Sequence, residues 1–201
     1  MAKAFKLGLT GSIATGKSTV LQLFADLGVP VFSADDAVHE LYRGEAAAAV
    51  DKLFPGVARN GVIDRRELSR RLLESPERIK ELEAVVHPLV RHRVAGFLAA
   101  AEKADAALAV VDIPLLFETG FDYGLDAVAV TVCDEATQRQ RALARPGMTV
   151  EKLDGILARQ LPQADKRLRA TYLFDTTLPR RRTRQMVAAL VEAIRARAGK
   201  P

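Results

Sequence analysis

The sequence has only one cysteine, Cys133, among its 201 residues. A single cysteine cannot form an internal disulfide, and this suits the reducing cytoplasm, where we expect the protein to act. We interpret Cys133 as a small apolar side chain at the end of a strand. No apolar run approaches the roughly 20 residues of a membrane-spanning helix, and the stretch before the first motif is too short for a signal peptide. We therefore expect no membrane partner.

Acidic residues are too few to balance the basic ones, which leaves a net charge of +5. Such an excess is typical either of nucleic-acid binding or of a site for several phosphates. The arginine run at 180–184 has no interleaved aromatic residues on which bases could stack. Most other basic residues are scattered among acidic neighbours. The composition therefore favours a small polyanionic substrate and no nucleic acid.

A phosphate-binding motif lies near the N-terminus, between an apolar run at 5–9 and a helical pattern at 20–24. Residues 11–18, GSIATGKS, match G-x-x-x-x-G-K-[ST] at every defined position. In such a loop, backbone N–H groups surround phosphate oxygens at the start of a helix. Lys17 would contact the β- and γ-phosphates, and the Ser18 hydroxyl would bind Mg²⁺. The motif predicts a site for ATP and Mg²⁺.

Further apolar runs alternate with helical patterns, which predicts an α/β fold with parallel strands. We expect the later strands to end at Ser33, Ile113, Val132 and Asp175. The connection between the second and third of the five strands is far longer than the roughly dozen residues that a parallel crossover needs. No convincing strand is predicted within it, and His87-Pro88 is expected to break or kink its helices, with a further helix over 89–103. This connection predicts a helical insertion that holds a substrate.

A helix that begins at Asp134 carries Arg139, Arg141 and Arg145, and Thr149 is expected to cap another helix through Leu161. The three arginines do not share one helical stripe, so only one or two are expected to contact phosphate. A last helix after Arg180 is expected to bury Met186, Val187, Leu190, Val191 and Ile194.

Three carboxylates are candidates for chemistry. Ser33 is expected to cap a helix with Asp36 in its first turn, while Asp35 follows the second strand beside the phosphate loop. Asp112 lies next to the end of the third strand, where it would reach Mg²⁺ through water or position Lys17. Phosphate loop, insertion and arginine-bearing helix together predict a small-molecule kinase.

The chain resembles dephospho-coenzyme A kinases over nearly its full length. The resemblance rests on GLTGSIATGKSTV at the start, SAD with His39, NGVIDRREL, VVHPLV, VVDIPLLFE, TQRQRALAR and ILARQLPQADK. It implies transfer of a phosphoryl group from ATP to the ribose 3′-hydroxyl of dephospho-coenzyme A, which is the last step of coenzyme A synthesis. It also implies one P-loop kinase domain over residues 1–201, a three-layer αβα fold with a five-stranded parallel sheet. Within this domain it implies a coenzyme-binding subdomain at 34–105 and a lid at 134–169.

The resemblance also implies roles for particular residues. Asp35 would be the base, with Lys17 and Arg141 as the other catalytic residues. His87, Pro114 and Leu115 would shape the acceptor site. Ser18 and Asp112 would serve the metal, and the triphosphate would be held by Gly11, Ser12, Ile13, Ala14, Thr15, Gly16, Lys17, Ser18 and Thr19.

The chain departs from the family's pattern in three places: Ser33 stands where an aspartate is usual, the loop interior has Ser12, Ala14 and Thr15 where it is usually rich in glycine, and Asp175-Thr176-Thr177 stand where an asparagine is common. Serine at position 33 leaves catalysis unaffected if Asp35 is the base. The second departure restricts the loop dihedrals. The third departure bears on the contact with adenine.

Three other functions remain open from the residues. A P-loop kinase for a nucleotide or small polyol is disfavoured by the insertion and by DIPLLFE. A GTP switch normally carries an N-K-x-D guanine reader, and none appears. A nucleic-acid-binding protein would show binding that weakens steeply with salt. We expect a monomer or weak homo-oligomer.

Overall fold

The computed structural model describes residues 3–199 and divides into two compact units. Unit 1 contains residues 3–32 and 97–199, and unit 2 contains residues 33–96. The helical insertion was predicted over 34–105. Helix α5 (Ile79–Lys103) continues from unit 2 into unit 1, so the chain passes between the units within one helix.

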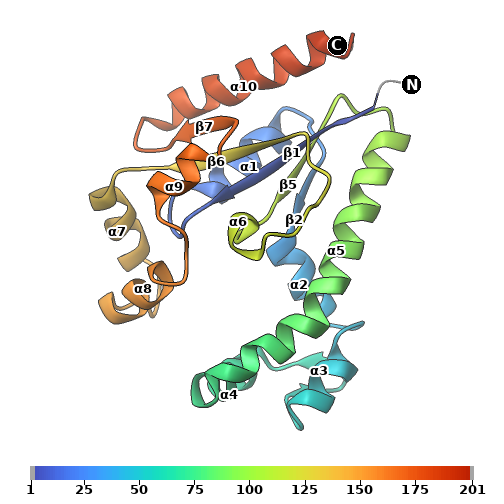
Figure 1. Ribbon diagram of the computed structural model, residues 1–201, viewed down its shortest axis with the longest axis vertical. Coiled ribbons are helices and arrows are strands. Elements are labelled where there is room, and N and C mark those ends of the chain that lie inside the picture. The colour runs from blue at the N-terminus through green and yellow to red at the C-terminus, as the bar shows by residue number, and fades with distance from the viewer. Residues whose placement is uncertain (1–2, 200–201) are drawn as a thin grey trace. The chain divides into compact units, whose positions relative to one another are not determined.

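A five-stranded parallel sheet forms the centre of unit 1, with the strand order β2-β5-β1-β6-β7 (Figure 1). This confirms the predicted α/β fold. The strands are β1 (Phe5–Gly11), β2 (Val31–Ser33), β5 (Leu108–Asp112), β6 (Ala127–Val132) and β7 (Tyr172–Asp175).

Helices cover both faces of this sheet. Side chains of Leu7 and Leu9 join Val20 and Phe24 of α1 (Lys17–Asp26) and Val187 of α10 (Arg180–Arg197) in a buried core. Figure 1 shows α10, in red, along this part of unit 1. Gly8, between the two leucines, faces Leu116 of α6 (Leu116–Thr119) instead, because successive strand residues point to opposite faces.

The register of the sheet brings three strand ends to one edge. Leu9 of β1 lies opposite Asp112 of β5, and Gly11 of β1 lies opposite Thr131 of β6. The phosphate loop therefore leaves β1 beside the last residues of both neighbouring strands. This is the position at which open α/β sheets bind ligands.

Unit 2 contains α2 (Ala34–Leu41), α3 (Ala47–Leu53), α4 (Arg65–Glu74), the short helix η1 (Pro76–Arg78) and the first part of α5. It also contains a small antiparallel hairpin of β3 (Ala58–Arg59) and β4 (Val62–Ile63). The prediction of no strand in this region was wrong. Asn60 and Gly61, both with positive φ, form the two-residue turn, and this Asn-Gly pair is the local signal for a hairpin.

His87-Pro88 was predicted to break or kink the helices, and the break was wrong, because α5 contains Pro88 in its interior and includes the separate helix predicted over 89–103. Proline lacks the N–H that would bond the carbonyl of Ala84, four residues earlier. Leu82, Val86, Val90, Val94 and Leu98 recur at helical spacing through this point, and all five are buried. Burial of this continuous apolar face outweighs the cost of one lost hydrogen bond.

Three predictions for the C-terminal half need correction. The helix capped by Thr149 is α8 (Val150–Leu157), which ends before the predicted Leu161. A separate helix, α9 (Gln163–Leu168), follows Pro162 and was not predicted. Met186 of α10 is 36% exposed, so it does not face the core as expected.

Candidate active site

The phosphate loop runs from the end of β1 to the start of α1, as predicted. Gly16 has a φ of 84°, in the left-handed region that glycine adopts without strain. A Cβ at Gly16 would lie 3.0 Å from side-chain atoms of Thr176, and one at Gly11 would lie 2.1 Å from Thr131 Oγ1. Both glycines of the motif are therefore required by backbone angle or by close packing.

Ala14, which stands where the family usually has glycine, also has a positive φ, of 61°. An L-residue in this region costs roughly 1–2 kcal/mol. The Ala14 side chain is buried with Ala142 of α7 (Glu135–Leu143) and Leu153 of α8, which offsets part of this cost. The alanine thus preserves the loop conformation and adds an apolar contact to these two helices.

Threonine hydroxyls fix the inner side of the loop. Thr15 Oγ1 donates to Ser12 O at 2.8 Å and lies 2.7 Å from Thr131 Oγ1. Thr176 Oγ1 donates to Thr15 O at 2.8 Å. Ser12, Thr15, Thr131 and Thr176 are all buried. The side chains of Ser12 and Thr15 therefore support the loop, and the part of these residues available to a phosphate is the backbone.

Lys17 and Asp112 form the central ion pair of the site. Lys17 Nζ donates to both carboxylate oxygens of Asp112, at 2.5 and 2.7 Å. The Asp112 residue is 4% exposed, and the Lys17 side chain is 14% exposed. Asp112 thus holds the ammonium group at the loop, which is one of the two roles expected for this carboxylate.

The turn after β5 is tied to β1. Ile113 N donates to Leu9 O at 2.9 Å, and Thr10 Oγ1 donates to Pro114 O at 3.2 Å. Leu115 is 38% exposed next to this anchored turn. Pro114 and Leu115 therefore lie at the strand edge that carries the phosphate loop.

Arg139, Arg141 and Arg145 differ in their contacts. Arg141 donates to Thr176 Oγ1 at 2.9 Å and to Thr176 O at 2.7 Å. Thr176 in turn donates to Thr15 O, so Thr176 connects Arg141 to the phosphate loop. Arg139 instead pairs with Asp154 of α8 at 2.9 Å, and Arg145 is exposed. Among the three, Arg141 has the contacts that connect it to the loop.

Asp35 and His87 belong to unit 2, whereas Lys17, Asp112 and Arg141 belong to unit 1. Asp35 is exposed in the first turn of α2. Ser33 caps this helix and accepts a hydrogen bond from Asp36 N at 3.1 Å, as predicted. His87 is half-buried in α5, directly before Pro88.

Comparison with known proteins assigns this arrangement to a family. The profile of the family described as Dephospho-CoA kinase matches residues 5–178. The chain belongs to the dephospho-CoA kinase family. A protein named dephospho-CoA kinase from Rhizobium meliloti is 52% identical over 94% of this chain and 98% of its own length. The predicted resemblance is confirmed.

Solved structures agree with the family assignment. A crystal structure of a Thermus thermophilus protein has a TM-score of 0.81 and 32% identity, with 96% of this chain and 98% of that chain covered. A dephospho-CoA kinase from Campylobacter jejuni has a TM-score of 0.69 and 25% identity, with the same coverage of both chains. The similarity extends over the whole fold and is not confined to the phosphate loop.

Two further groups of this family member were missed from the sequence. Lys166 is fully buried, and its Nζ forms an ion pair with Glu118 Oε1 at 2.8 Å. Burial raises the pKa of Glu118, but Lys166 and the N–H of Leu161 more than offset this, so its pKa lies below its ordinary value. The quoted segments DIPLLFE and ILARQLPQADK contain both residues, but lysine and glutamate ordinarily indicate a solvated surface.

Side-chain amides form the second missed group. Gln160 Oε1 accepts from Ile13 N at 3.0 Å, and Gln138 Nε2 donates to Ile13 O at 2.8 Å. Nothing in their spacing indicated a role, since glutamine is common on exposed helix faces.

Cys133 directly follows the last residue of β6 and is buried, as predicted. Burial raises the pKa of its thiol, which disfavours the reactive thiolate. Cys133 is therefore a packing residue.

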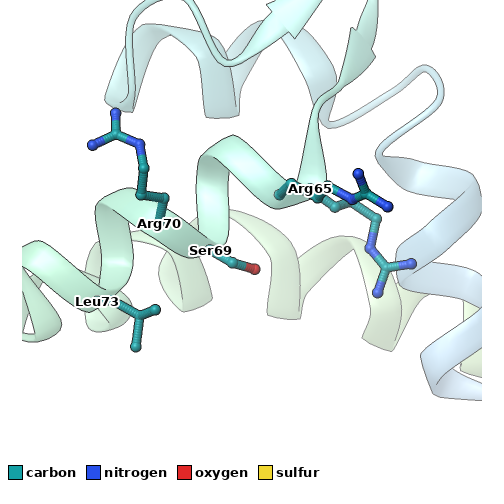
Figure 2. Close-up of a pocket in the computed structure, with 5 residues that line it drawn as sticks. Arg65, Ser69, Arg70 and Leu73 are labelled. Atoms are coloured by element: carbon teal, nitrogen blue, oxygen red, sulfur yellow. The ribbon is translucent and has the colours of Figure 1, made fainter. Parts of the chain in front are cut away.

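An open pocket of about 600 Å³ lies on α4 of unit 2, lined by Arg65, Arg66, Ser69, Arg70 and Leu73 (Figure 2). Figure 2 shows the Arg70 side chain directed away from Leu73. Arg70 pairs with Glu67 and Glu74, and Leu73 is 81% exposed. No residue predicted for catalysis lines this pocket.

Within residues 3–199, no group of three or more histidine, cysteine or acidic side chains is placed to hold a metal. Mg²⁺ in phosphate-transfer sites normally takes one or two protein ligands, with phosphates and water as the others. Ser18, exposed in the first turn of α1, fits that requirement. Over the same described range, no helix is long and apolar enough to cross a membrane.

Proposed function

We propose that this protein transfers the γ-phosphoryl group of ATP to the ribose 3′-hydroxyl of dephospho-coenzyme A, which gives coenzyme A. The observation that carries the proposal is Lys17, held by the buried Asp112 at the phosphate loop of a chain in the dephospho-CoA kinase family. Phosphoryl transfer depends mainly on positioning and charge stabilisation, and a pre-aligned lysine supplies both.

On the donor side, the backbone of residues 11–19 surrounds the triphosphate and Lys17 contacts its β- and γ-phosphates. Ser18 would bind Mg²⁺ directly. Asp112, whose two oxygens accept hydrogen bonds from Lys17, would act on the metal through water or would only position Lys17. Mg²⁺ supplies charge neutralisation between the β- and γ-phosphates when it is bound.

On the acceptor side, Asp35 orients the 3′-hydroxyl and takes its proton as the oxygen attacks the γ-phosphorus. Exposure of this carboxylate in the first turn of α2 leaves it accessible to a substrate. The bond from the γ-phosphorus to the bridging oxygen then breaks, and ADP leaves. His87, Pro114 and Leu115 shape the acceptor site in this proposal.

Arg141 stabilises the charge that develops on the transferred group. It reaches the phosphates by exchanging its contacts with Thr176 for contacts with the triphosphate. Residues 134–169, which carry Arg141, serve as the lid, and residues 34–105 hold the coenzyme.

Turnover of ATP and Mg²⁺ with dephospho-coenzyme A, measured against a panel of nucleosides, nucleotides and polyols, tests the proposal. We expect ADP release to be fast with dephospho-coenzyme A alone, and ³¹P NMR of the product to show a 3′-phosphomonoester. Faster turnover with a nucleotide or polyol would identify another P-loop kinase. Slow hydrolysis that no acceptor stimulates would indicate a regulatory nucleotide-binding protein.

We further propose that the protein acts in the cytoplasm, without nucleic acid, as a monomer or weak homo-oligomer. Sedimentation velocity over a concentration series tests the oligomeric state. Binding to nucleic acid that weakens steeply with salt would contradict the proposal that the protein acts without nucleic acid.

A further inference from the structure

Both polar groups of Ile13, in the middle of the phosphate loop, are held by glutamines from distant parts of the chain. Ile13 N–H donates to Gln160 Oε1 at 3.0 Å, and Ile13 C=O accepts from Gln138 Nε2 at 2.8 Å. Gln138 lies in α7 (Glu135–Leu143), and Gln160 follows α8. Two separate pieces of the lid segment therefore hold one residue of the loop.

Both ends of the Gln138 amide are held by hydrogen bonds. Gln138 is 4% exposed, and its Oε1 accepts from Gln163 Nε2 at 2.8 Å. Gln163 Oε1 in turn accepts from Cys133 N at 3.1 Å. Each of these amides is paired at both ends, and a paired polar network in a low-dielectric interior is rigid.

The backbone at Gln160 is held in place by a contact of the next residue, Leu161. Leu161 N donates to Glu118 Oε1 at 2.9 Å, and Glu118 pairs with the fully buried Lys166. The hydrogen bond from Leu161 and the ion pair with Lys166 of α9 both end on Glu118 of α6, so they anchor the chain from Leu161 into α9 to that helix. As a result, Gln160 is presented to Ile13 by a buried contact rather than by a mobile loop.

The loop needs such support, because the residue after Ile13 is the strained Ala14, with its φ of 61°. A residue in the left-handed region keeps that conformation only where its surroundings impose it. The two glutamine contacts lie directly before this residue, and its Cβ packs on Ala142 of α7 and Leu153 of α8. The lid segment thus surrounds the strained part of the loop.

We propose that Gln138 and Gln160 are positioning residues that hold the phosphate loop in its ATP-binding conformation through the peptide groups of Ile13. The proposal rests on the proposed function only in taking ATP as the ligand. Neither side chain touches the reacting atoms in this proposal, and both act through the backbone of the loop. A purely structural role, in which the glutamines attach α7 and α8 to the core, would change stability without changing ATP affinity.

The central experiment compares Gln160→Met and Gln138→Met with wild type, and uses Gln140→Met as the matched control. Methionine keeps the length of glutamine and removes its polar end, and Gln140 is exposed on α7. Isothermal titration calorimetry measures ATP affinity, and steady-state kinetics gives KM for each substrate. We expect ATP affinity to fall about tenfold in both variants, the ordinary value of one lost hydrogen bond. In both variants, KM for dephospho-coenzyme A should stay at its wild-type value. The Gln140→Met control should have wild-type ATP affinity and wild-type KM values.

A second pair of variants separates the effect of hydrogen bonding from the effect of charge. Gln160→Glu keeps an acceptor for Ile13 N–H, whereas Gln138→Glu places an acceptor against Ile13 C=O. Both variants add the same charge beside the same residue. We expect Gln160→Glu to bind ATP more tightly than Gln138→Glu, whereas equal affinities would contradict a hydrogen-bonding role.

Wild-type ATP affinity in Gln160→Met would overturn the proposal, whatever its melting temperature. Gln160 is half-buried, so this variant remains informative even if the deeply buried Gln138→Met fails to fold. If wild type binds ATP but does not phosphorylate dephospho-coenzyme A, the proposed function fails. Weaker ATP binding in the variants would still support the positioning role.

Discussion

Lys17 and Asp35, the two side chains on which the proposed reaction depends most, are held in different ways. Lys17 is largely buried and makes two hydrogen bonds to Asp112, within a loop that Thr176, Gln138 and Gln160 support. Asp35 is exposed on a short helix of the other unit. The donor side is therefore organised before any ligand binds, whereas the acceptor-side carboxylate is left accessible to its substrate. In such a design, donor-site changes should affect ATP binding, and acceptor-site changes should affect turnover alone.

Asp35→Asn tests the acceptor side and should have the largest effect. The variant keeps size and much hydrogen bonding but cannot accept a proton, so we expect kcat to fall by about 10²–10⁴-fold. ATP affinity, measured by calorimetry, should not change. Asp36→Asn is the matched control and should alter only helix stability. Normal turnover in Asp35→Asn with a loss in Asp36→Asn or Asp112→Asn would assign the base to another carboxylate. Activity in all three would leave positioning and charge as the whole of catalysis.

Lys166→Met tests the buried ion pair that joins α9 to Glu118 of α6. Removal of one partner leaves Glu118 without its cation, and breaking a buried pair costs about 3–5 kcal/mol in the free energy of unfolding. Urea denaturation measures the loss. A double variant, Lys166→Met with Glu118→Gln, removes both charges and should recover part of the stability. A single variant as stable as wild type would show that the pair contributes nothing.

Glu118 also predicts how stability depends on pH. Its pKa is lower in the folded protein, so the unfolded chain binds more protons below the ordinary pKa of 4.5. The contribution of this residue is present above that pH and is lost as the pH falls through the lowered folded pKa. In Lys166→Met the remaining buried carboxylate should have a raised pKa, so acid unfolding should begin at higher pH. Urea denaturation from pH 3 to 7 measures the shift; identical pH profiles would contradict it.

Lys17→Ala tests the donor side. We expect kcat/KM for ATP to fall by about 10²–10³-fold, because a preorganised donor to the transferred group is lost. Circular dichroism should show an intact fold, and the exposed Lys103→Ala is the matched control. Near-normal turnover in a folded Lys17→Ala protein would refute the phosphate site.

Arg141→Ala and Arg139→Ala compare two arginines of one helix and should have the smallest effects. Arg141 contacts Thr176 beside the loop, so its loss should lower kcat by about 10²-fold. Arg139 makes only a surface pair with Asp154, and such pairs contribute about 0–1 kcal/mol. Steady-state kinetics of both variants gives the two kcat values. Equal, mild decreases in kcat would show that this helix face is merely solvated.

The sequence alone determined the phosphate loop, the five strands and the family. Each depends on local order: a defined motif, an apolar run that ends in a turn, or a series of quoted segments. The loop position of Lys17 and Ser18 follows from the same motif, because their spacing from Gly11 and Gly16 sets which backbone groups and side chains face a phosphate. Ser33 as a helix cap was likewise readable, since capping acts within three residues.

Only the tertiary structure decided how distant side chains pair. The pairs of Lys17 with Asp112, of Thr176 with Thr15 and of the two glutamines with Ile13 join residues far apart in the chain. Threonine or glutamine alone indicates no such partner. The same holds for α5, where burial of a long apolar face overrides the local effect of Pro88. Local preferences are short-ranged, whereas burial and hydrogen bonding in the folded chain depend on which segments the sheet brings together.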